Sequence, residues 1–477
     1  MNVDLLIKDA QVVNGWGRFQ GWVAVQNGVV VAMGTGNDAP VADRIIDAQG
    51  KYVLPGAIEP HAHYAVYRPI EEDMEWETRS AAAGGVTTVL TSIVNPASYL
   101  HVIDHMIRMV EEKALVDISF NTFMLSQIHL DEMEQYLEKG VASFKFLMAY
   151  KGEEGRQVGI QGADDGYLLR GFEAAARMGD PALPMIHAEN SEICWEMMDR
   201  MKKAGRVDLG AWADGRPDYA ESTDFFKAAQ LAEMARSPLY IVHTSSAKTV
   251  QIIAEAKARG VRVIAETCPH YLNFTRDADF GVLGKVNPSI KEQKDSDMLW
   301  WGLTNGVIDC MGTDHCCLMK KDKWGQGDIW SALPGFPGTA TMLPSLLSEG
   351  VNKGRLTLER VVAVTSYNTA KAFGMLPRKG MIAVGSDADF AIVDLGLEQE
   401  VSAPMLHSAS DFTLFDGWTL KGWPTATVVR GNVVFKDGKI IGKAGTGRFV
   451  ARPRGEYAGV QVRTNAVSGG VIVNAEK

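Results

Sequence analysis

The sequence predicts an α/β fold, in which a (β/α)8 TIM-type barrel carries a small β-sandwich domain built from both chain ends. Two observations predict it. Apolar, β-branched runs alternate with long helical stretches through the middle of the chain, the pattern of parallel strands joined by helices. Short β-type runs separated by turn signals occupy both ends. We therefore expect residues 56–378 to form the barrel, and residues 1–55 and 379–477 to form the sandwich domain.

The barrel prediction depends on eight runs with the composition of buried strands. They are residues 53–63, 85–93, 116–125, 142–150, 184–190, 239–246, 262–270 and 308–315. The stretches between them are typical of amphipathic helices. In residues 191–205 and 224–237, for example, apolar side chains recur at i, i+3 and i+4. Active sites of such barrels lie at the carboxyl ends of the strands, so the polar residues at those ends are the candidates for function.

The sandwich prediction depends on β-type runs at the two ends of the chain. The N-terminal runs are residues 5–13, 22–34 and 44–54, and the C-terminal runs are residues 385–395, 425–441 and 448–453. Their spacing of roughly ten residues indicates an antiparallel sheet. Both ends consist of short β-type runs separated by turn signals, which suggests that they are two halves of one domain.

Composition excludes several classes of protein. The chain has 477 residues, with 48 Lys and Arg against 58 Asp and Glu, which gives a net charge of −10. That acidity argues against a nucleic-acid partner. No secretory signal and no apolar run long enough for a membrane span is visible, so we expect a cytoplasmic protein without a membrane partner. Five cysteines without a C-x-x-C pair predict neither disulfides nor a cysteine zinc site.

Six polar residues fall in or at the ends of the predicted barrel strands. They are His61, His63, Lys145, His187, His243 and Asp314. One strand-end histidine is usually structural, but the H-x-H pair places two imidazoles on the same side of a strand, where they can bind one ion. A lysine inside an apolar strand is costly unless it is paired or chemically altered. It could instead reach out of the barrel mouth on its flexible stem.

The order of these residues along the strands resembles that of the metal-dependent amidohydrolase superfamily. Within it, the chain looks like the cyclic amidohydrolases, namely hydantoinase, dihydropyrimidinase, allantoinase and dihydroorotase. The segments that carry the resemblance cover nearly the whole chain: PGAIEPHAH, SFKFLMAYKG, IHAEN, IVHTSSA, ETCPHYL, GTDHC, SYNTAKAFGM and GSDADFAIVD.

The resemblance implies a centre of two divalent ions, for which Zn²⁺ is the best fit. Lys145 would be carboxylated by CO2 and bridge the ions. His61, His63 and Asp314 would complete one metal site, and His187 and His243 the other. A metal-bridging hydroxide would attack the amide carbonyl of a hydantoin- or dihydropyrimidine-like ring, and Asp314 would move the proton.

Substrate contacts are expected from loops at the same end of the barrel. By resemblance Tyr150 would stabilise the oxyanion. Asn287 stands where hydantoinases have a serine, and Ser289 follows in the same ring-binding loop. Thr341 stands where the relatives place a ring-binding asparagine, which puts a standard dihydropyrimidine substrate in doubt. Tyr64, in the loop after the first barrel strand, is a further candidate contact.

Three alternatives remain open at this point. The ring could be allantoin, or the substrate could be an unusual cyclic or linear amide. Dihydroorotate is less favoured, because its enzymes have H-x-H-x-R where this chain continues with Tyr64 and Ala65. A non-catalytic scaffold related to dihydropyrimidinase is a third reading. By analogy we expect a homodimer or homotetramer.

Overall fold

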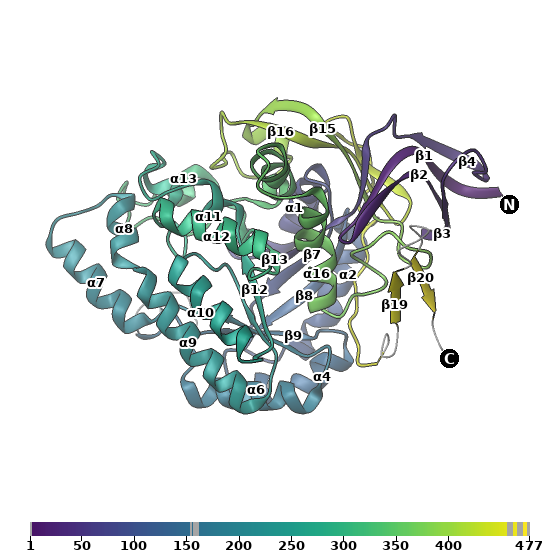
Figure 1. Cartoon of the computed structure of the whole chain (residues 1–477). Helices are drawn as coiled ribbons and strands as arrows, with labels where there is room; N and C mark the ends of the chain where they lie inside the picture. Colours follow the sequence, from purple (N-terminus) through teal and green to yellow (C-terminus); the bar gives the residue numbers. More distant parts are fainter. Residues whose placement is uncertain (1, 153–154, 156–161, 456–460, 465–470, 475–477) are drawn as a thin grey trace.

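The computed structural model describes residues 2–152, 155, 162–455, 461–464 and 471–474. Two large sheets organise them, with a short hairpin of β19 (Gln461–Thr464) and β20 (Val471–Asn474) beside them. Figure 1 shows the parallel strands in the middle of the molecule, the teal helices to one side, and the purple and yellow-green chain ends together on the other.

The barrel sheet consists of parallel strands in sequence order. Its strands are β6 (Ala57–His63), β7 (Val86–Ile93), β8 (Asp117–Phe123), β9 (Ser143–Leu147), β10 (Leu183–His187), β11 (Leu239–Ile241), β12 (Val263–Thr267), β13 (Cys310–Met311) and β14 (His315–Cys316). The predicted eighth strand is present as two pieces. β13 pairs with β12 and β14 pairs with β6, so the barrel closes through this broken strand.

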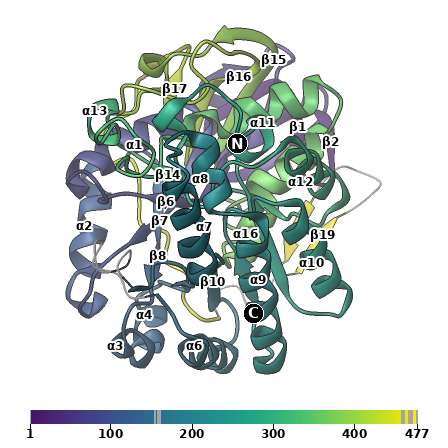
Figure 2. The same cartoon turned by 90° about the vertical axis from the view of Figure 1, so that its left-hand side faces the viewer.

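Helices follow the strands and cover the outside of the barrel (Figure 2). The longer ones are α1 (Ile70–Ala83), α2 (Ile103–Lys113), α6 (Asp165–Met178), α7 (Ser191–Lys203), α9 (Asp218–Ala235), α10 (Ala247–Ala258) and α12 (Gln293–Asn305). Their starts carry the expected caps: the side chains of Asp164, Asn190 and Ser246 each accept a backbone N–H of the first turn.

Shorter helices fill the loops and follow the last barrel strand. They are η1 (Tyr99–His101), α3 (Gln127–Asp131), α4 (Met133–Glu138), α8 (Leu209–Gly215), α11 (Pro269–Asn273), η2 (Gly281–Gly284), α13 (Lys320–Lys323), η3 (Thr339–Thr341), α14 (Met342–Ser345), η4 (Leu346–Asn352), α15 (Leu358–Val362), η5 (Ala363–Tyr367), α16 (Asn368–Ala372) and η6 (Ala403–Leu406). Several of them lie at the barrel end that carries the candidate site.

The second sheet joins the two ends of the chain. It contains β1 (Asn2–Asn14), β2 (Gly17–Gln26), β3 (Val29–Gly34), β4 (Val41–Asp47), β5 (Tyr52–Pro55), β15 (Phe390–Glu400), β16 (Thr419–Val429), β17 (Asn432–Lys436) and β18 (Lys439–Ile440). The join is the antiparallel pair β5 and β15. The sheet branches at β1, which pairs with both β4 and β5.

One apolar core holds the two halves of this sheet together. Ile7 and Val23 from the N-terminal strands pack in the same buried cluster as Phe390 and Val428 from the C-terminal strands. The predicted fold class, a TIM-type barrel with a β domain from both ends, is confirmed. The domain boundaries at residues 56 and 378 stay a prediction. Over the described ranges, no helix has the length and apolar character needed to cross a membrane.

Candidate active site

The six predicted metal ligands converge at the carboxyl end of the barrel. His61 and His63 end β6, Lys145 lies in β9, and Asp314 lies between β13 and β14. His63 Nε2 is 3.1 Å from His61 Nε2, 3.0 Å from Asp314 Oδ1 and 3.3 Å from Lys145 Nζ. The Lys145 ammonium also contacts His61 Nε2 directly. Four side chains from three parts of the barrel thus point at one small volume.

The remaining two predicted ligands form a pair next to this group. His187 ends β10, and His243 follows β11 by two residues. His243 Nε2 is 2.9 Å from His187 Nδ1, and the rings of His61 and His243 lie 5.3 Å apart between centroids. The site therefore divides into a cluster of His61, His63, Lys145 and Asp314 and a neighbouring histidine pair, as two adjacent metal sites would require.

Burial keeps His61, His63 and His243 neutral, which is the form that binds metals. Burial, and then the charge of Lys145, lowers the pKa of His63 to about 3. Burial also lowers the pKa values of His61 and His243 well below the usual range. Burial lowers the pKa of Lys145 to about 8. Neutral imidazoles, a carboxylate and a buried amine in contact fit two divalent cations of the zinc type.

Three residues of the site have backbone φ angles in the left-handed region. These are Tyr150 at 59°, His243 at 40° and Asp314 at 53°. Such angles cost free energy for residues other than glycine and persist where the surrounding structure enforces them. At Asp314 this geometry coincides with the break between β13 and β14, so the break turns the carboxylate into the site.

Two buried glutamates orient the ligands, and neither was predicted from the sequence. Glu266 of β12 lies 2.9 Å from His61 Nδ1 and accepts the backbone N–H of His243 at 2.9 Å. Glu59 of β6 accepts the N–H groups of His61 and Thr313, each at 3.0 Å. Glu59 directly follows apolar Ala57 and Ile58, and Glu266 directly follows the apolar run 263–265. A charged residue inside each predicted strand was the available signal. Carboxylates in this position fix the orientation of metal-binding histidines.

A buried ionic network supports the histidine pair from the other side. Glu189 Oε2 is 3.4 Å from His187 Nε2 and forms an ion pair with Arg216. The Lys291 ammonium donates to Ser289 Oγ at 2.7 Å and to the Arg216 carbonyl at 2.5 Å. Because Glu189 accepts from Nε2, the His187 Nδ1 atom presents its lone pair toward His243 Nε2.

The predicted substrate residues fall into two groups. Tyr150 lies at the histidine pair, with its ring 5.6 Å from that of His187, and its hydroxyl accepts from Asn287 Nδ2 at 3.0 Å. Ser289 lies in the same loop as Asn287 and is buried. Thr341, in η3, is also buried, and its hydroxyl donates to the Gly338 carbonyl at 2.9 Å. The structure links Tyr150 and Asn287 to the site directly, whereas the substrate role of Thr341 stays a prediction.

Tyr64 takes a different position. Its side chain is buried beside His315, with the rings 6.1 Å apart, and its hydroxyl has no hydrogen-bond partner among the described residues. The Tyr64 hydroxyl therefore forms no hydrogen bond with any of the six predicted ligands, all of which the structure describes. Its role as a substrate contact stays a prediction.

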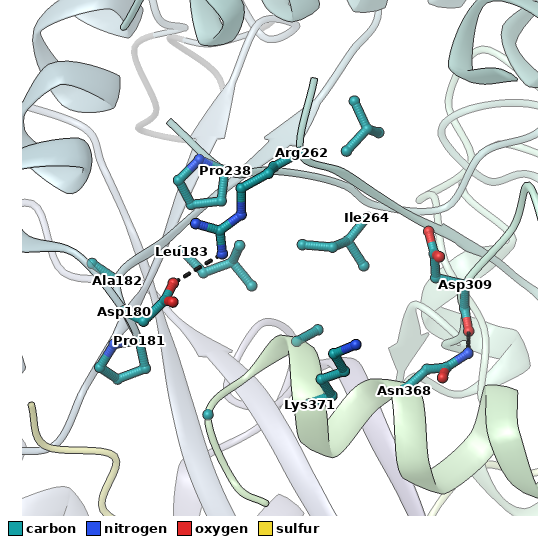
Figure 3. Close-up of a pocket in the computed structure, with 13 residues that line it drawn as sticks. Asp180, Pro181, Ala182, Leu183, Pro238, Arg262, Ile264, Asp309, Asn368 and Lys371 are labelled. Carbon is teal, nitrogen blue, oxygen red and sulfur yellow. Dashed lines mark hydrogen bonds and ion pairs between the residues drawn. The ribbon is translucent and has the colours of Figure 1, made fainter. Parts of the chain in front are cut away.

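A pocket of about 450 Å³ lies at the opposite end of the barrel (Figure 3). It is lined by residues at the amino ends of the strands, such as Leu183 of β10 and Val263 of β12. Figure 3 shows Arg262 reaching toward Asp180 across its mouth. The predicted ligands, all of which the structure describes, lie outside this pocket, so the chemistry belongs to the other end of the barrel.

Fold and site together define a metal-dependent hydrolase on a TIM-type barrel. The chain belongs to the amidohydrolase family, whose model matches residues 52–434. It is 35% identical over 465 residues to a D-hydantoinase of Geobacillus stearothermophilus, covering 94% of this chain and 96% of that one. It is 33% identical over 461 residues to an L-hydantoinase of Paenarthrobacter aurescens, covering 94% and 98%. The predicted superfamily is confirmed.

Solved structures show the same similarity in three dimensions. A D-hydantoinase from Bacillus sp. AR9 superimposes with a TM-score of 0.87 at 33% identity, covering 94% of this chain and 99% of that one. A dihydropyrimidinase from Brevibacillus agri NCHU1002 superimposes with a TM-score of 0.86, also at 33% identity, covering 94% and 98%. These likenesses extend over the barrel and the β domain together.

Proposed function

We propose that this protein hydrolyses the ring amide of a cyclic ureide, such as a hydantoin or a dihydropyrimidine. Water would add across the ring C–N bond: the carbonyl carbon gains oxygen and becomes a carboxylate, and the ring nitrogen gains a hydrogen. A hydantoin would give an N-carbamoyl amino acid. The observation that carries the proposal is the convergence of His61, His63, Lys145, Asp314 and the histidine pair at the barrel mouth.

The donor set fits a pair of divalent ions. His61, His63 and Asp314 would hold one ion, and His187 and His243 the other. Lys145, once carboxylated by CO2, would offer an oxygen to each. Lys145 contacts both histidines of the first site, and its strand β9 pairs with β10, which ends in His187 of the second; this supports the role. Zn²⁺ is the ion we propose. When bound, such ions lower the pKa of water toward neutrality and polarise a carbonyl.

The chain's own groups would then bind the ring and move the proton. Asp314 would take a proton from the attacking water and deliver it to the departing ring nitrogen. The Tyr150 hydroxyl would donate to the oxygen on which negative charge develops. Asn287 would hold that hydroxyl in place, and backbone groups around Ser289 would bind the imide. We place Thr341 and Tyr64 further out, as weaker determinants of the substrate.

The test combines a metal analysis with ring-opening assays. Lys145→Ala should lose both bound metal and ring opening, whereas Lys139→Ala, which removes an exposed lysine paired with Asp104, should keep both. Full activity in Lys145→Ala would overturn the mechanism. Assays over hydantoin, phenylhydantoin, dihydrouracil, allantoin and dihydroorotate would identify the ring.

The complete ligand set favours catalysis over a scaffold role. Every residue type needed for the two metal sites is present and in contact, so we place the non-catalytic reading last. Allantoin or an unusual cyclic or linear amide is the second candidate, since Thr341 stands where relatives carry a ring-binding asparagine. A homodimer or homotetramer and a cytoplasmic location are part of the proposal.

A further inference from the structure

A buried lysine outside the proposed ligand set joins two loops at the carboxyl end of the barrel. Lys323 lies in α13, which follows the last barrel strand, and its side chain is fully buried. Its Nζ atom donates to the backbone carbonyls of Lys285 at 2.8 Å, Leu333 at 2.9 Å and Gly335 at 2.6 Å. The first acceptor belongs to the loop after β12, and the other two lie between α13 and η3. Lys323 therefore ties the loop after the last strand to the loop after β12.

Three carbonyl oxygens around one nitrogen match the ammonium form of Lys323. Only an ammonium has three N–H donors, and each of them finds an acceptor here. Burial lowers the pKa of Lys323, and the charge of Lys285 lowers it further. A buried cation is costly unless hydrogen bonds compensate for the lost water. The carbonyls supply this compensation only while both loops keep their places, so the charge and the loop positions depend on each other.

A second buried lysine crosses the same junction in the opposite direction. The Lys285 ammonium, which comes from the loop after β12, donates to the Ala332 carbonyl at 2.7 Å in the loop after the last strand. The Gly335 N–H returns a hydrogen bond of 3.0 Å to the Lys285 carbonyl. The lysine pair, Lys285 and Lys323, therefore fastens the two loops to each other from both sides.

The fastened loop is the one expected to bind the substrate ring. Asn287 lies two residues beyond Lys285 and donates to the Tyr150 hydroxyl at 3.0 Å, beside the histidine pair. Trp212 Nε1 donates to the carbonyl of Val286, between them, at 3.0 Å. With so short a link along the chain, a shift of the Lys285 carbonyl would carry Asn287 with it. The lysine pair therefore bears on the position of the ring-binding groups.

We propose that Lys323 is a positioning residue for the substrate, which sets the place of the ring-binding loop by holding the Lys285 carbonyl. The inference rests on the proposed function, because ring binding by the loop of Asn287 and Ser289 is part of that proposal. The three hydrogen bonds of Lys323 go to backbone carbonyls and to none of the six proposed ligands. Loss of the ammonium would loosen the ring-binding loop and leave the metal ligands in place.

Lys323→Met tests this, because it removes the three donors and keeps most of the length of the side chain. We expect KM for ring opening to rise by about 10- to 100-fold, as for a substrate whose binding groups are misplaced. The metal content should stay that of wild type, and kcat should fall no further than in Asn287→Ala. Lys321→Met, on an exposed lysine of the same helix, should match wild type in all three. Lys323→Gln keeps an amide donor for the carbonyls and should raise KM less, and it replaces Lys323→Met where that variant does not fold.

Hydrogen–deuterium exchange gives a readout that does not depend on turnover. Residues 282–292 should exchange faster in the Lys323 variant, whereas residues 143–147 of β9 should exchange as in wild type. An unchanged KM in the folded variant, or unchanged exchange in residues 282–292, would overturn the proposal. Metal loss with faster exchange throughout the barrel would also overturn it, since Lys323 would then only stabilise the fold. If wild type opens none of the rings tested, the proposed function fails, and the exchange measurement still decides the role of Lys323.

Discussion

His61 Nδ1 lies 2.9 Å from Oε1 of Glu266, and both side chains are fully buried. The same glutamate oxygen accepts the backbone N–H of His243, and the other oxygen accepts the Tyr240 hydroxyl at 2.8 Å. One carboxylate therefore orients a residue from each of the two proposed metal sites. The His61 Nε2 atom is left to face His63, Lys145 and Asp314, as a metal ligand must.

We expect Glu266→Ala to weaken metal binding by about 10- to 100-fold, because His61 loses the partner that fixes its ring. Glu266→Gln keeps an oxygen acceptor for His61 and should lose less. Metal content after dialysis against graded chelator measures the effect. Tyr240→Phe removes only one donor to the carboxylate and is the control. Equal metal affinity in Glu266→Ala and wild type would show that the ring is held by other contacts.

Tyr150→Phe should lower kcat for ring opening by about 10²- to 10³-fold, the usual cost of losing one donor to a developing oxyanion. Its metal content should not change, because Tyr150 is not a proposed ligand. Asn287→Ala, which removes the donor at 3.0 Å from the Tyr150 hydroxyl, should have a smaller effect of the same kind. A loss confined to KM would assign the hydroxyl to ground-state binding.

The sequence was sufficient for the barrel and the β domain, because these depend on periodicity, and strand position placed the six predicted metal ligands at one end of the barrel. All eight predicted barrel strands are present, the last in two pieces. The break at Asp314 was not predictable, since it depends on a left-handed backbone angle that no local turn signal marks. The branch of the second sheet at β1 was not predicted either. Residues 2–8 of this one strand pair with β4 and residues 11–12 pair with β5.

The groups around the ligands were not predicted for a physical reason. Glu59 and Glu266 act through partners 2 to 254 residues away, so no local spacing reveals them. Tyr64 was assigned to the substrate because it follows the H-x-H pair. Its backbone leaves the strand there, and its side chain packs against His315. Strand alternation cannot be extended past the last residue of a strand.

The ion pair between Glu189 and Arg216 gives a prediction for the histidine pair. Both side chains are 1% exposed, so Glu189→Gln would leave the Arg216 charge without its buried partner. We expect the free energy of unfolding to fall by about 3–5 kcal/mol, as for other broken buried pairs. Metal affinity at His187 should fall as well, because its Nε2 loses a charged acceptor. Urea denaturation and metal titration measure the two effects, with Glu196→Gln on an exposed pair as the control.

Lys379 gives a prediction for the junction between the barrel and the second sheet. Its buried ammonium lies 2.5 Å from Asp117 of β8, 2.5 Å from Asp389 and 2.8 Å from Asp387, and Arg430 also pairs with Asp117. Lys379→Met leaves these carboxylates without their central cation. We expect it to lower the free energy of unfolding by about 3–5 kcal/mol in urea denaturation. Lys139→Met, on an exposed pair, should change it by less than about 1 kcal/mol.

The same ion pairs predict how stability depends on pH. Burial alone would lower the pKa of Lys379, but the charges of Asp117 and Asp389 outweigh it and raise that pKa above its usual range. The folded protein then retains a proton that the unfolded chain loses above about pH 10.4. The stability from Lys379 is thus fully present below that pH and declines as the pH rises toward the folded pKa. Wild type should lose stability between about pH 10 and 11 more steeply than Lys379→Met. Parallel urea midpoints for the two proteins over this range would mean that the Lys379 pKa is not raised by folding.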